Sequence, residues 1–402
     1  MIGIREIEEA RARIDDFVIR TPCPRSETFS ALCGARTWFK LENLQMTGSF
    51  KERGALNRIL SLTPEERARG VIAASAGNHA QGVAYHAGRL GIPATIVMPD
   101  RTPLIKVANT RRFGAKVVLA GGNFDEAYAV ARRLQEEENL VFVHPFDDDS
   151  IIAGQGTIGL ELLEQIPDLE VAIVPIGGGG LISGVAVALK ETRPRIRVIG
   201  VQTAAFPSMK ASVDASEPVT VAAGRTIADG IAVKRPGGKT LEYVRRYVDE
   251  VVTVDEEEIA NAILLLLERE KTVVEGAGAV PLAALLNRRC SGTEGRNVAM
   301  LLSGGNIDVN LISRIIERGL VKDGRMVRLM VRIEDRPGSL ARLTALVAEQ
   351  AANIIEIHHD RAFGKSGYGE TEVSLTLETR GRDHVEQLTQ ALDRAGYRIS
   401  EL

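Results

Sequence analysis

Lys51 lies in a segment whose residue types suit covalent chemistry by its amine. Phe50 precedes it, glycines bracket the run Thr47-Gly48-Ser49-Phe50-Lys51-Glu52-Arg53-Gly54, and a helix-like run is expected at residues 55–62. Such glycines let the chain pack closely around a flat ring while the lysine reaches over its face. A lysine amine placed in this way forms an imine with an aldehyde cofactor. The segment therefore predicts a Schiff-base lysine, although a lysine at a helix start is, taken alone, more often a solvated side chain.

Three further segments place small and polar residues after strand-like apolar runs. Ser75-Ala76-Gly77-Asn78-His79 follows residues 71–74, four glycines follow residues 171–176, and Ser303-Gly304-Gly305-Asn306 follows residues 298–302. Open α/β sheets bind ligands beyond the carboxyl ends of their strands. These segments together favour a ligand site around Lys51 over a solvated lysine.

The four glycines precede a helix-like segment at residues 183–191, and they are Gly177, Gly178, Gly179 and Gly180. Their N–H groups and the helix N-terminus can hold a phosphate, whereas a plain structural turn is the alternative. A dinucleotide is a poorer ligand, because the third glycine of its fingerprint is missing and the next strand ends at Gln202 instead of an acidic residue. A compact cofactor with a single phosphate fits better.

The polar residues of the other segments have ligand roles and helix capping as alternatives. Ser75 and Asn78 lie on a turn that leads into a helix-like run, whose free N–H groups could hold a substrate carboxylate. Ser303 could face a pyridine nitrogen, and its neutral hydroxyl would leave that ring a mild electron sink, which favours elimination. Glu275 lies in a helix-breaking stretch and is open between a pocket residue and a surface carboxylate.

The spacing of apolar residues predicts the elements that position these segments. Between about residues 71 and 302, short Val, Ile and Ala runs alternate with amphipathic stretches, which is typical of a parallel, doubly wound α/β sheet. The expected strands include 94–98, 116–119, 171–175 and 198–201, and the expected helices include 125–138 and 256–270.

A second unit follows a polar, glycine-containing link at residues 321–325. Its pattern predicts a small ferredoxin-like α+β fold built from two half-repeats of strand, helix and strand. The expected strands are 327–333, 354–359 and 372–379, the expected helices are 340–350 and 383–395, and a glycine-rich loop joins the second and third strands.

The composition is that of an ordinary soluble globular protein. The 402 residues carry a net charge of −3, so neither nucleic acid nor a membrane is an implied partner. Residues 1–20 lack the apolar core of a signal peptide, and no run approaches the ~20 apolar residues of a membrane span, so a cytoplasmic location is expected. The three cysteines show no metal spacing, and no carboxylate or cysteine joins His79 and His86, so no metal site is expected.

Together these motifs resemble the fold-type II pyridoxal-phosphate-dependent enzymes, and among them the threonine dehydratase (threonine ammonia-lyase) family. The motifs at 47–54, 75–82, 177–180 and 303–306 occur in the family's order. The C-terminal part resembles an ACT domain, a small-molecule sensing module, through Asp335-Arg336-Pro337-Gly338-Ser339-Leu340. The resemblance implies two open, mostly parallel α/β subdomains in residues 1–322, the smaller at roughly 45–145, and an ACT domain at 326–402.

The resemblance also implies a role for each site residue. Lys51 would bind pyridoxal 5'-phosphate as a Schiff base and act as the catalytic base, with Phe50 against the ring, Asn78 at the ring hydroxyl, Gly177, Gly178, Gly179 and Gly180 at the phosphate, and Ser303 at the ring nitrogen. Ser75, Gly77 and His79 would hold the substrate carboxylate. In the ACT domain, Gly338, Leu340, Asn353 and Ile354 would bind a regulatory amino acid.

The implied activity is β-elimination from L-threonine to 2-oxobutanoate and ammonia, and secondarily from L-serine to pyruvate. Isoleucine biosynthesis, a branched-chain amino acid effector and a homodimer or homotetramer are further expectations from the resemblance. Serine racemase is the nearest rival, but Ala76 stands where it has a proton-handling serine. A β-replacement enzyme of the cysteine-synthase kind is a second alternative. A sensor on a retired catalytic fold is the third, and intact Lys51, Asn78 and Ser303 argue against it.

Overall fold

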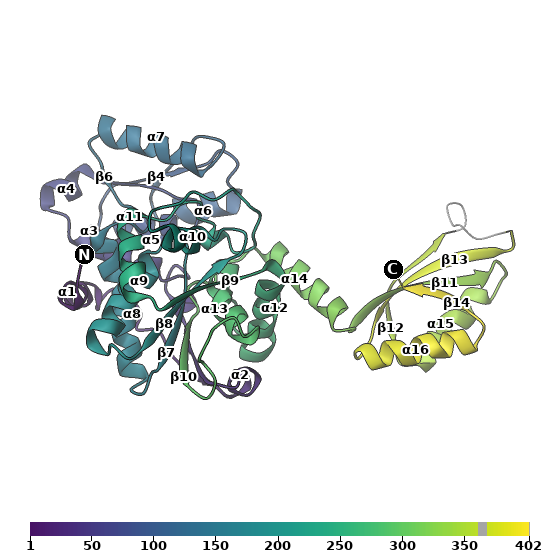
Figure 1. The fold of residues 1–402 in the computed structure, drawn as a ribbon. Coiled ribbons are helices and arrows are strands. Elements are labelled where there is room, and N and C mark those ends of the chain that lie inside the picture. Colours follow the sequence, from purple (N-terminus) through teal and green to yellow (C-terminus); the bar gives the residue numbers. More distant parts are fainter. Residues whose placement is uncertain (361–367, 402) are drawn as a thin grey trace. The chain divides into compact units, whose positions relative to one another are not determined.

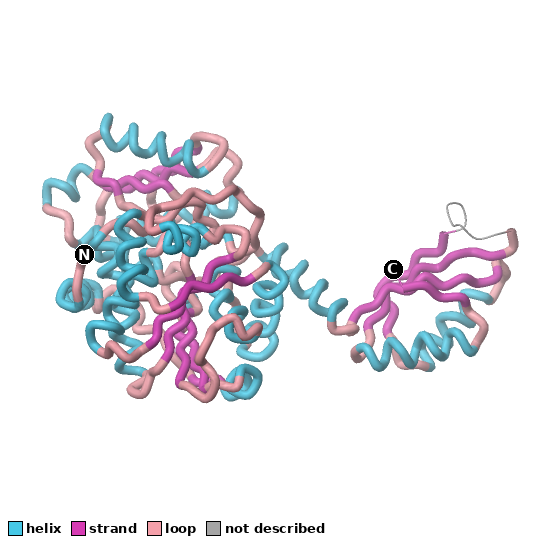
Figure 2. The backbone as a smooth tube through the Cα atoms, in the orientation of Figure 1, coloured by secondary structure: helices cyan, strands magenta, loops and turns pink. Residues whose placement is uncertain are grey.

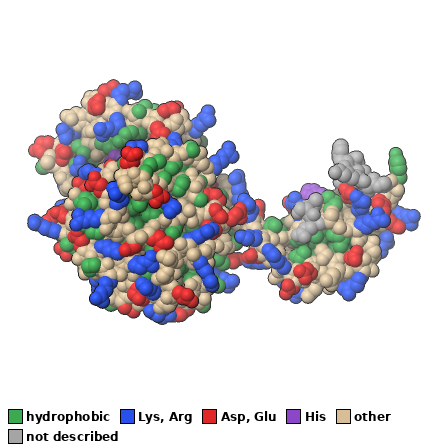
Figure 3. Space-filling view, in the orientation of Figure 1, with side chains coloured by type: hydrophobic (Ala, Val, Ile, Leu, Met, Phe, Trp, Pro, Cys, Tyr) green, Lys and Arg blue, Asp and Glu red, His purple; other side chains and the backbone are tan. Residues whose placement is uncertain are grey.

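The computed structural model describes residues 1–360 and 368–401. The chain folds into two compact units, Met1–Ile307 and Asp308–Leu402 (Figure 1). The strands of the first unit form two separate sheets among helices, and those of the second unit form a single sheet (Figure 2). No helix within the described ranges is long and apolar enough to cross a membrane. On the face drawn in Figure 3, basic and acidic side chains are interspersed.

The larger sheet has six strands in the order β1-β2-β10-β7-β8-β9. β1 is antiparallel to β2, and all other neighbours in this sheet are parallel. Every residue of β7 and β10 is buried, which is why parallel strands such as β7 consist of continuous apolar runs. The strands are β1 (Arg25–Ser26), β2 (Arg36–Lys40), β7 (Val171–Pro175), β8 (Arg197–Thr203), β9 (Glu250–Val254) and β10 (Asn297–Leu301).

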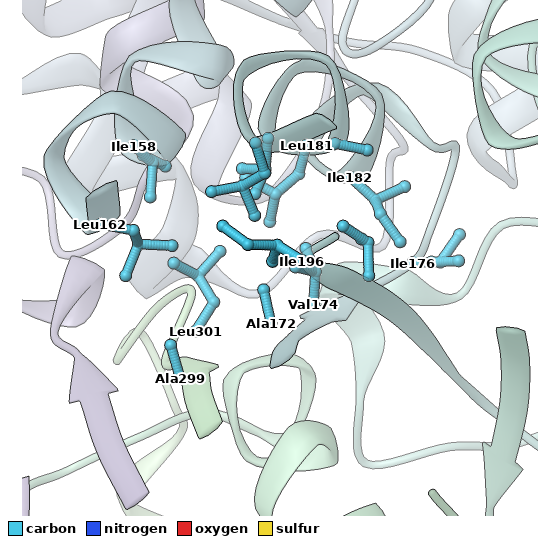
Figure 4. Close-up of a cluster of buried hydrophobic side chains, with 14 of the residues drawn as sticks. Ile158, Leu162, Ala172, Val174, Ile176, Leu181, Ile182, Ile196, Ala299 and Leu301 are labelled. Carbon is cyan, nitrogen blue, oxygen red and sulfur yellow. The ribbon is translucent and has the colours of Figure 1, made fainter. Parts of the chain in front are cut away.

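Helix α9 (Gly180–Thr192) packs on this sheet, and helix α8 (Asp149–Gln165) packs on α9. Leu181 of α9, Val174 of β7 and Leu301 of β10 belong to one buried apolar cluster (Figure 4). A Cβ on Gly184 would lie 2.2 Å from the carbonyl oxygen of Ile152, so α9 approaches α8 more closely than a larger residue would allow. This close packing fixes the helix whose N-terminus carries the four glycines.

The smaller sheet has four parallel strands in the order β5-β4-β3-β6. Helix α3 (Lys51–Leu60) packs on α5 (Asn78–Arg89) and on α8. The predicted site segments thus follow β3 in the smaller sheet and β7 and β10 in the larger one. The strands are β3 (Val71–Ala74), β4 (Ala94–Met98), β5 (Lys116–Leu119) and β6 (Val141–Phe142), and the helices among them are α5 (Asn78–Arg89), α6 (Leu104–Arg111) and α7 (Phe124–Glu137).

The helix predicted at 256–270 is divided in the structure. It consists of α12 (Glu256–Leu265) followed by a π-helical turn, η3 (Leu266–Glu270). The other helices of the first unit are α1 (Ile4–Ile14), α2 (Glu27–Cys33), η1 (Glu42–Leu44), α4 (Pro64–Arg69), α10 (Ser208–Ala215), η2 (Asp229–Ile231), α11 (Gly238–Tyr247) and α13 (Gly276–Leu286).

The second unit has an antiparallel sheet in the order β12-β13-β11-β14, which is the predicted ferredoxin-like arrangement. Its first helix, α14 (Val309–Lys322), extends into the predicted link, and β14 (Arg398–Glu401) is a strand that the pattern did not predict. The predicted glycine-rich loop lies largely outside the described residues. The remaining elements are β11 (Met326–Glu334), α15 (Ser339–Glu349), β12 (Asn353–Asp360), β13 (Glu370–Glu378) and α16 (Arg382–Arg394).

Candidate active site

Lys51 is the first residue of α3, and its amine lies against the backbone of a distant segment. Its Nζ donates a hydrogen bond of 2.9 Å to the carbonyl oxygen of Pro145 and lies 5.3 Å from the centre of the Phe50 ring. Loss of water around the amine lowers the pKa of Lys51 to about 8, and the nearby Glu275 opposes this shift. An amine that loses its proton near pH 8 is a better nucleophile and base than an ordinary lysine.

The lysine segment lies beside the serine segment that follows β10. The N–H of Phe50 donates to the carbonyl oxygen of Ser303 at 3.1 Å. Gly48 has a φ of +76°, and a Cβ at this position would lie 2.8 Å from Oδ1 of Asn306. Glycine is therefore favoured at position 48 by its backbone conformation and by the space available.

A buried charge cluster joins the start of α3 to α8. Arg53 pairs with Glu42 at 2.7 Å and with Glu161 at 2.6 Å, and Glu161 also pairs with Lys40. Two cations thus face two carboxylates. Because a buried charge without its partner is costly, the cluster holds the α3 start, and with it the backbone of Lys51, in one place.

Asn78, the first residue of α5, connects the lysine and serine segments through hydrogen bonds. Its Nδ2 donates to Oε1 of Glu275 at 2.7 Å, and its Oδ1 accepts from Nδ2 of Asn306 at 2.8 Å. Nδ2 of Asn306 also donates to the carbonyl oxygen of Thr47 at 2.7 Å. The structure therefore brings Asn78 together with both segments, and Glu275 belongs to the same cluster.

The residues predicted to hold a carboxylate lie at the turn before α5 and in its first turn, but they do not all direct their side chains alike. The N–H of Gly77 donates to Oγ of Ser75 at 3.2 Å. The buried His79 ring instead hydrogen-bonds through Nε2 to the carbonyl oxygen of Val143 at 2.9 Å, and burial lowers the pKa of His79 to about 3, with the charge of Lys51 adding to the effect. The neutral His79 ring is therefore engaged by the backbone just after β6, so any contact of His79 with a carboxylate would come from its main chain.

The four glycines form the turn between β7 and α9. Gly179, with a φ of +97°, caps α9, and Oγ1 of Thr240 donates to the carbonyl oxygen of Gly178 at 2.6 Å. A Cβ on Gly178 would lie 2.3 Å from the ring of Phe146. Among the described residues, the N–H groups from Gly177 to Gly180 have no hydrogen-bond acceptor. Free N–H groups at a helix N-terminus are suited to an anion such as a phosphate.

Ser303 is 2% exposed and lies just beyond the end of β10. Its carbonyl oxygen is occupied by Phe50, but its hydroxyl makes no hydrogen bond within the part of the chain that the structure describes. The hydroxyl oxygen itself is not sealed from solvent, so a ligand can reach it and supply the missing partner. The amine of Lys51, the amide of Asn78, the free N–H groups of the glycine turn and this hydroxyl together match the aldehyde, hydroxyl, phosphate and ring nitrogen of pyridoxal 5'-phosphate.

Sequence patterns did not identify every member of the site. They left Glu275 undecided, and the structure buries it at 4% exposure. Burial, followed by the charge of Asp229, raises the pKa of Glu275 to about 8. Pro145 and Phe146 carry no signal in the sequence, because a backbone carbonyl and an apolar ring near a ligand have no characteristic pattern. Asn306 was part of a matched motif but received no role.

The four residues predicted to bind a regulatory amino acid fall into two places. Gly338, with a φ of +87°, caps α15, and Leu340 follows it, near the end of β11. Asn353 and Ile354 instead begin β12. Glu370 pairs with the end of β11 and Glu378 with Asn353, so the two places are separated by roughly 25 Å along the strands. One chain therefore does not bring these four residues together.

Two known families match consecutive parts of the chain. The "Pyridoxal-phosphate dependent enzyme" family matches residues 14–304, and the "ACT domain" family matches residues 327–396.

Individual relatives cover the whole chain. An L-threonine ammonia-lyase of Geobacter sulfurreducens is 54% identical over 402 residues, covering 100% of both chains. An L-threonine ammonia-lyase of Thermotoga maritima is 53% identical over 399 residues, covering 99% of both. Among solved structures, maize serine racemase superposes with a TM-score of 0.75 at 38% identity, covering 80% of this chain and 98% of its own. With the lysine, glycine and serine segments arranged as described, the chain belongs to the pyridoxal-phosphate-dependent enzyme family and carries a C-terminal ACT domain.

Proposed function

We propose that the protein is an L-threonine ammonia-lyase that converts L-threonine to 2-oxobutanoate and ammonia, and secondarily L-serine to pyruvate. The observation that carries this proposal is the position of the Lys51 amine, which is held by the Pro145 carbonyl beside the Asn78 and Ser303 segments. Two relatives named L-threonine ammonia-lyase, similar over almost the full length of the chain, support the choice of threonine.

Pyridoxal 5'-phosphate, when bound, supplies an electron sink that stabilises negative charge on the substrate carbon beside the amine. Lys51 would hold the cofactor until the substrate amine displaces it, and the freed amine would then take the proton from Cα of the substrate, a contribution of about 10²–10⁴-fold to the rate. The N–H groups in the first turn of α5, at Asn78 and His79, would hold the substrate carboxylate. The uncharged Ser303 hydroxyl would keep the ring nitrogen neutral and so favour elimination over a long-lived carbanion. The β-hydroxyl would leave as water, with a proton from the cofactor phosphate.

Two related activities are distinguished by direct assays. Racemisation needs a proton donor on the second face of the substrate, and the methyl side chain of Ala76 cannot supply one. Incubation of the purified protein with pyridoxal 5'-phosphate and L-threonine is expected to release 2-oxobutanoate and ammonia in equal amounts. Formation of D-serine from L-serine as the main product would favour racemisation, and cysteine formed from an activated serine and sulfide would favour β-replacement.

Residues 1–322 are proposed as the catalytic part, with a smaller subdomain at roughly 45–145, and residues 326–402 as the regulatory part. A branched-chain amino acid, isoleucine first, is the proposed effector, acting through its different affinity for two states of the enzyme. Because Gly338 and Asn353 are far apart within one chain, an effector site containing both needs a second copy, which supports a homodimer or homotetramer. We place the enzyme in the cytoplasm and in isoleucine biosynthesis.

Titration of isoleucine and valine against threonine turnover tests the regulatory proposal. Replacement of Asn353 by alanine should shift the effector concentration for half-maximal response without changing turnover in its absence. Identical kinetics with and without either amino acid would contradict the proposal.

A further inference from the structure

Glu275 is fixed in the site by its own main chain. Its N–H donates to the carbonyl oxygen of Gly304 at 3.0 Å. Its carbonyl oxygen accepts from the N–H groups of Gly278 and Ala279, at 2.9 and 3.0 Å, at the start of α13. The backbone of Glu275 is therefore hydrogen-bonded both to the serine segment and to helix α13, and this limits where its side chain can lie.

Two glycines leave the space that the carboxyl occupies. A Cβ on Gly304 would lie 2.4 Å from Oε1 of Glu275, and a Cβ on Gly230 would lie 3.3 Å from the same atom. Any larger residue at position 304 would displace the carboxyl. Since the same oxygen accepts the hydrogen bond from Asn78, these glycines keep Glu275 within reach of the Asn78 amide.

The hydrogen bonds around Asn78 admit one orientation of its amide. The carbonyl oxygen of Thr47 only accepts, so it must face the amide nitrogen of Asn306. That nitrogen also faces Asn78, which must therefore present its Oδ1 to Asn306 and its Nδ2 to Glu275. An exchange of oxygen and nitrogen on Asn78 would place two amide donors against each other.

One hydrogen on Nδ2 of Asn78 remains after the bond to Glu275, and no other acceptor for it lies in the described ranges. We propose that Glu275 is a positioning residue whose carboxyl fixes the Asn78 amide, so that this second hydrogen is directed to the ring hydroxyl oxygen of pyridoxal 5'-phosphate. The inference rests on the role proposed for Asn78 in the function described above.

The charge state of Glu275 determines which substitution preserves its hydrogen bond to Asn78. The charged groups that influence it are Asp229 of η2, Lys106 of α6 and Lys51 of α3. Burial and Asp229 raise the pKa of Glu275 to about 8, so the carboxyl holds a proton at neutral pH. A protonated carboxyl still accepts a hydrogen bond at its carbonyl oxygen, and a glutamine side chain is neutral, has nearly the same shape and accepts in the same way.

The experiment measures binding of pyridoxal 5'-phosphate to the full chain by equilibrium titration, together with the absorbance spectrum of the bound cofactor. Glu275→Ala and Asn78→Ala should each raise the dissociation constant about 5–10-fold, the effect of losing one hydrogen bond between uncharged groups. The double variant should bind no more weakly than Asn78→Ala alone, because both substitutions remove one contact. Glu275→Gln should bind within about threefold of the unmodified protein and keep its spectrum.

Controls separate positioning from folding and from the choice of substrate. Glu275→Leu keeps the volume but accepts no hydrogen bond, so it should behave as Glu275→Ala does, and the exposed Glu217→Ala should not change binding. Additive losses in the double variant, or a Glu275→Gln protein as weak as Glu275→Ala, would overturn the inference. Cofactor binding by the unmodified protein without threonine turnover would count against the proposed function alone, since the binding cycle does not use threonine.

Discussion

The amine of Lys51 donates a 2.9 Å hydrogen bond to the carbonyl oxygen of Pro145, a residue 94 positions further along the chain. The segment after β6 therefore receives the side chain that begins α3. This hydrogen bond fixes the position of the amine, and the loss of surrounding water lowers its pKa. The amine is therefore in place and reactive in the protein before its cofactor binds.

The lowered pKa of Lys51 predicts unusual reactivity in the protein freed of cofactor. As the pH rises through about 8, the amine loses its proton and becomes nucleophilic, whereas a free lysine side chain requires a pH near 10.4. Reductive methylation across pH 6–10, followed by mass spectrometry of the peptide containing Lys51, measures this midpoint. The exposed Lys210 provides an internal comparison, and equal labelling profiles for both lysines would contradict the prediction.

The buried charge cluster behind α3 predicts a large loss of stability when one partner is removed. Arg53→Ala leaves Glu42 and Glu161 without their main cation and should lower the free energy of unfolding by about 3–5 kcal/mol. Arg11→Ala breaks the partly exposed pair with Glu164 and should cost at most about 1 kcal/mol. Urea unfolding of both variants compares their free energies of unfolding. Equal losses would show that burial does not determine how much an ion pair contributes to stability.

The glycine turn predicts a steric effect on cofactor binding. A methyl group at position 178 would meet the Phe146 ring and displace both that ring and the turn. Gly178→Ala should therefore lower the free energy of unfolding by about 1–3 kcal/mol and weaken cofactor binding. Titration with pyridoxal 5'-phosphate measures the loss of cofactor affinity, and a thermal melt measures the loss of stability. Gly122→Ala is the matched control, because a Cβ there meets only Glu126 at 3.7 Å. Unchanged affinity and melting of Gly178→Ala would contradict the close contact.

The buried histidines predict a loss of stability in mild acid. Burial lowers the pKa of His79 to about 3 and that of His144 to about 4, while both titrate near 6.5 in the unfolded chain. Below pH 6.5 the unfolded state therefore binds more protons, and stability falls as the pH drops toward 4. Nδ1 of His144 accepts from two N–H groups, a role that asparagine can imitate without titrating. His144→Asn should therefore show a weaker pH dependence in urea unfolding between pH 7 and 5, and an unchanged slope would refute this assignment.

The sequence predicts an element well where neighbouring residues determine its conformation, and poorly where distant contacts do. The strands Val71–Ala74 and Val171–Pro175 were predicted residue for residue, because buried parallel strands are short continuous apolar runs between polar turns. Helix α3 begins four residues before the predicted start at Ala55, because Arg53 and its neighbours look like a polar loop until their partners from α8 and residue 42 are known.

Distant contacts also explain what the sequence left open at the site. Glu275 could not be assigned, because its burial depends on Asn78, 197 positions away, and on glycines from two other segments. His79 was expected beside the substrate carboxylate, yet the direction of its ring is set by the carbonyl oxygen of Val143, just after β6. The pattern predicts which segments meet, and tertiary packing decides which atoms of those segments face the ligand.

The most direct test of the account is borohydride trapping of the cofactor on the protein, combined with threonine turnover. The protein incubated with pyridoxal 5'-phosphate and reduced should carry the pyridoxyl group on Lys51, and the unreduced protein should form 2-oxobutanoate from L-threonine. Lys51→Ala should lose the label and at least about 10²-fold of the turnover, while Lys210→Ala keeps both. A pyridoxyl group on another lysine, or full turnover by Lys51→Ala, would contradict the central claim.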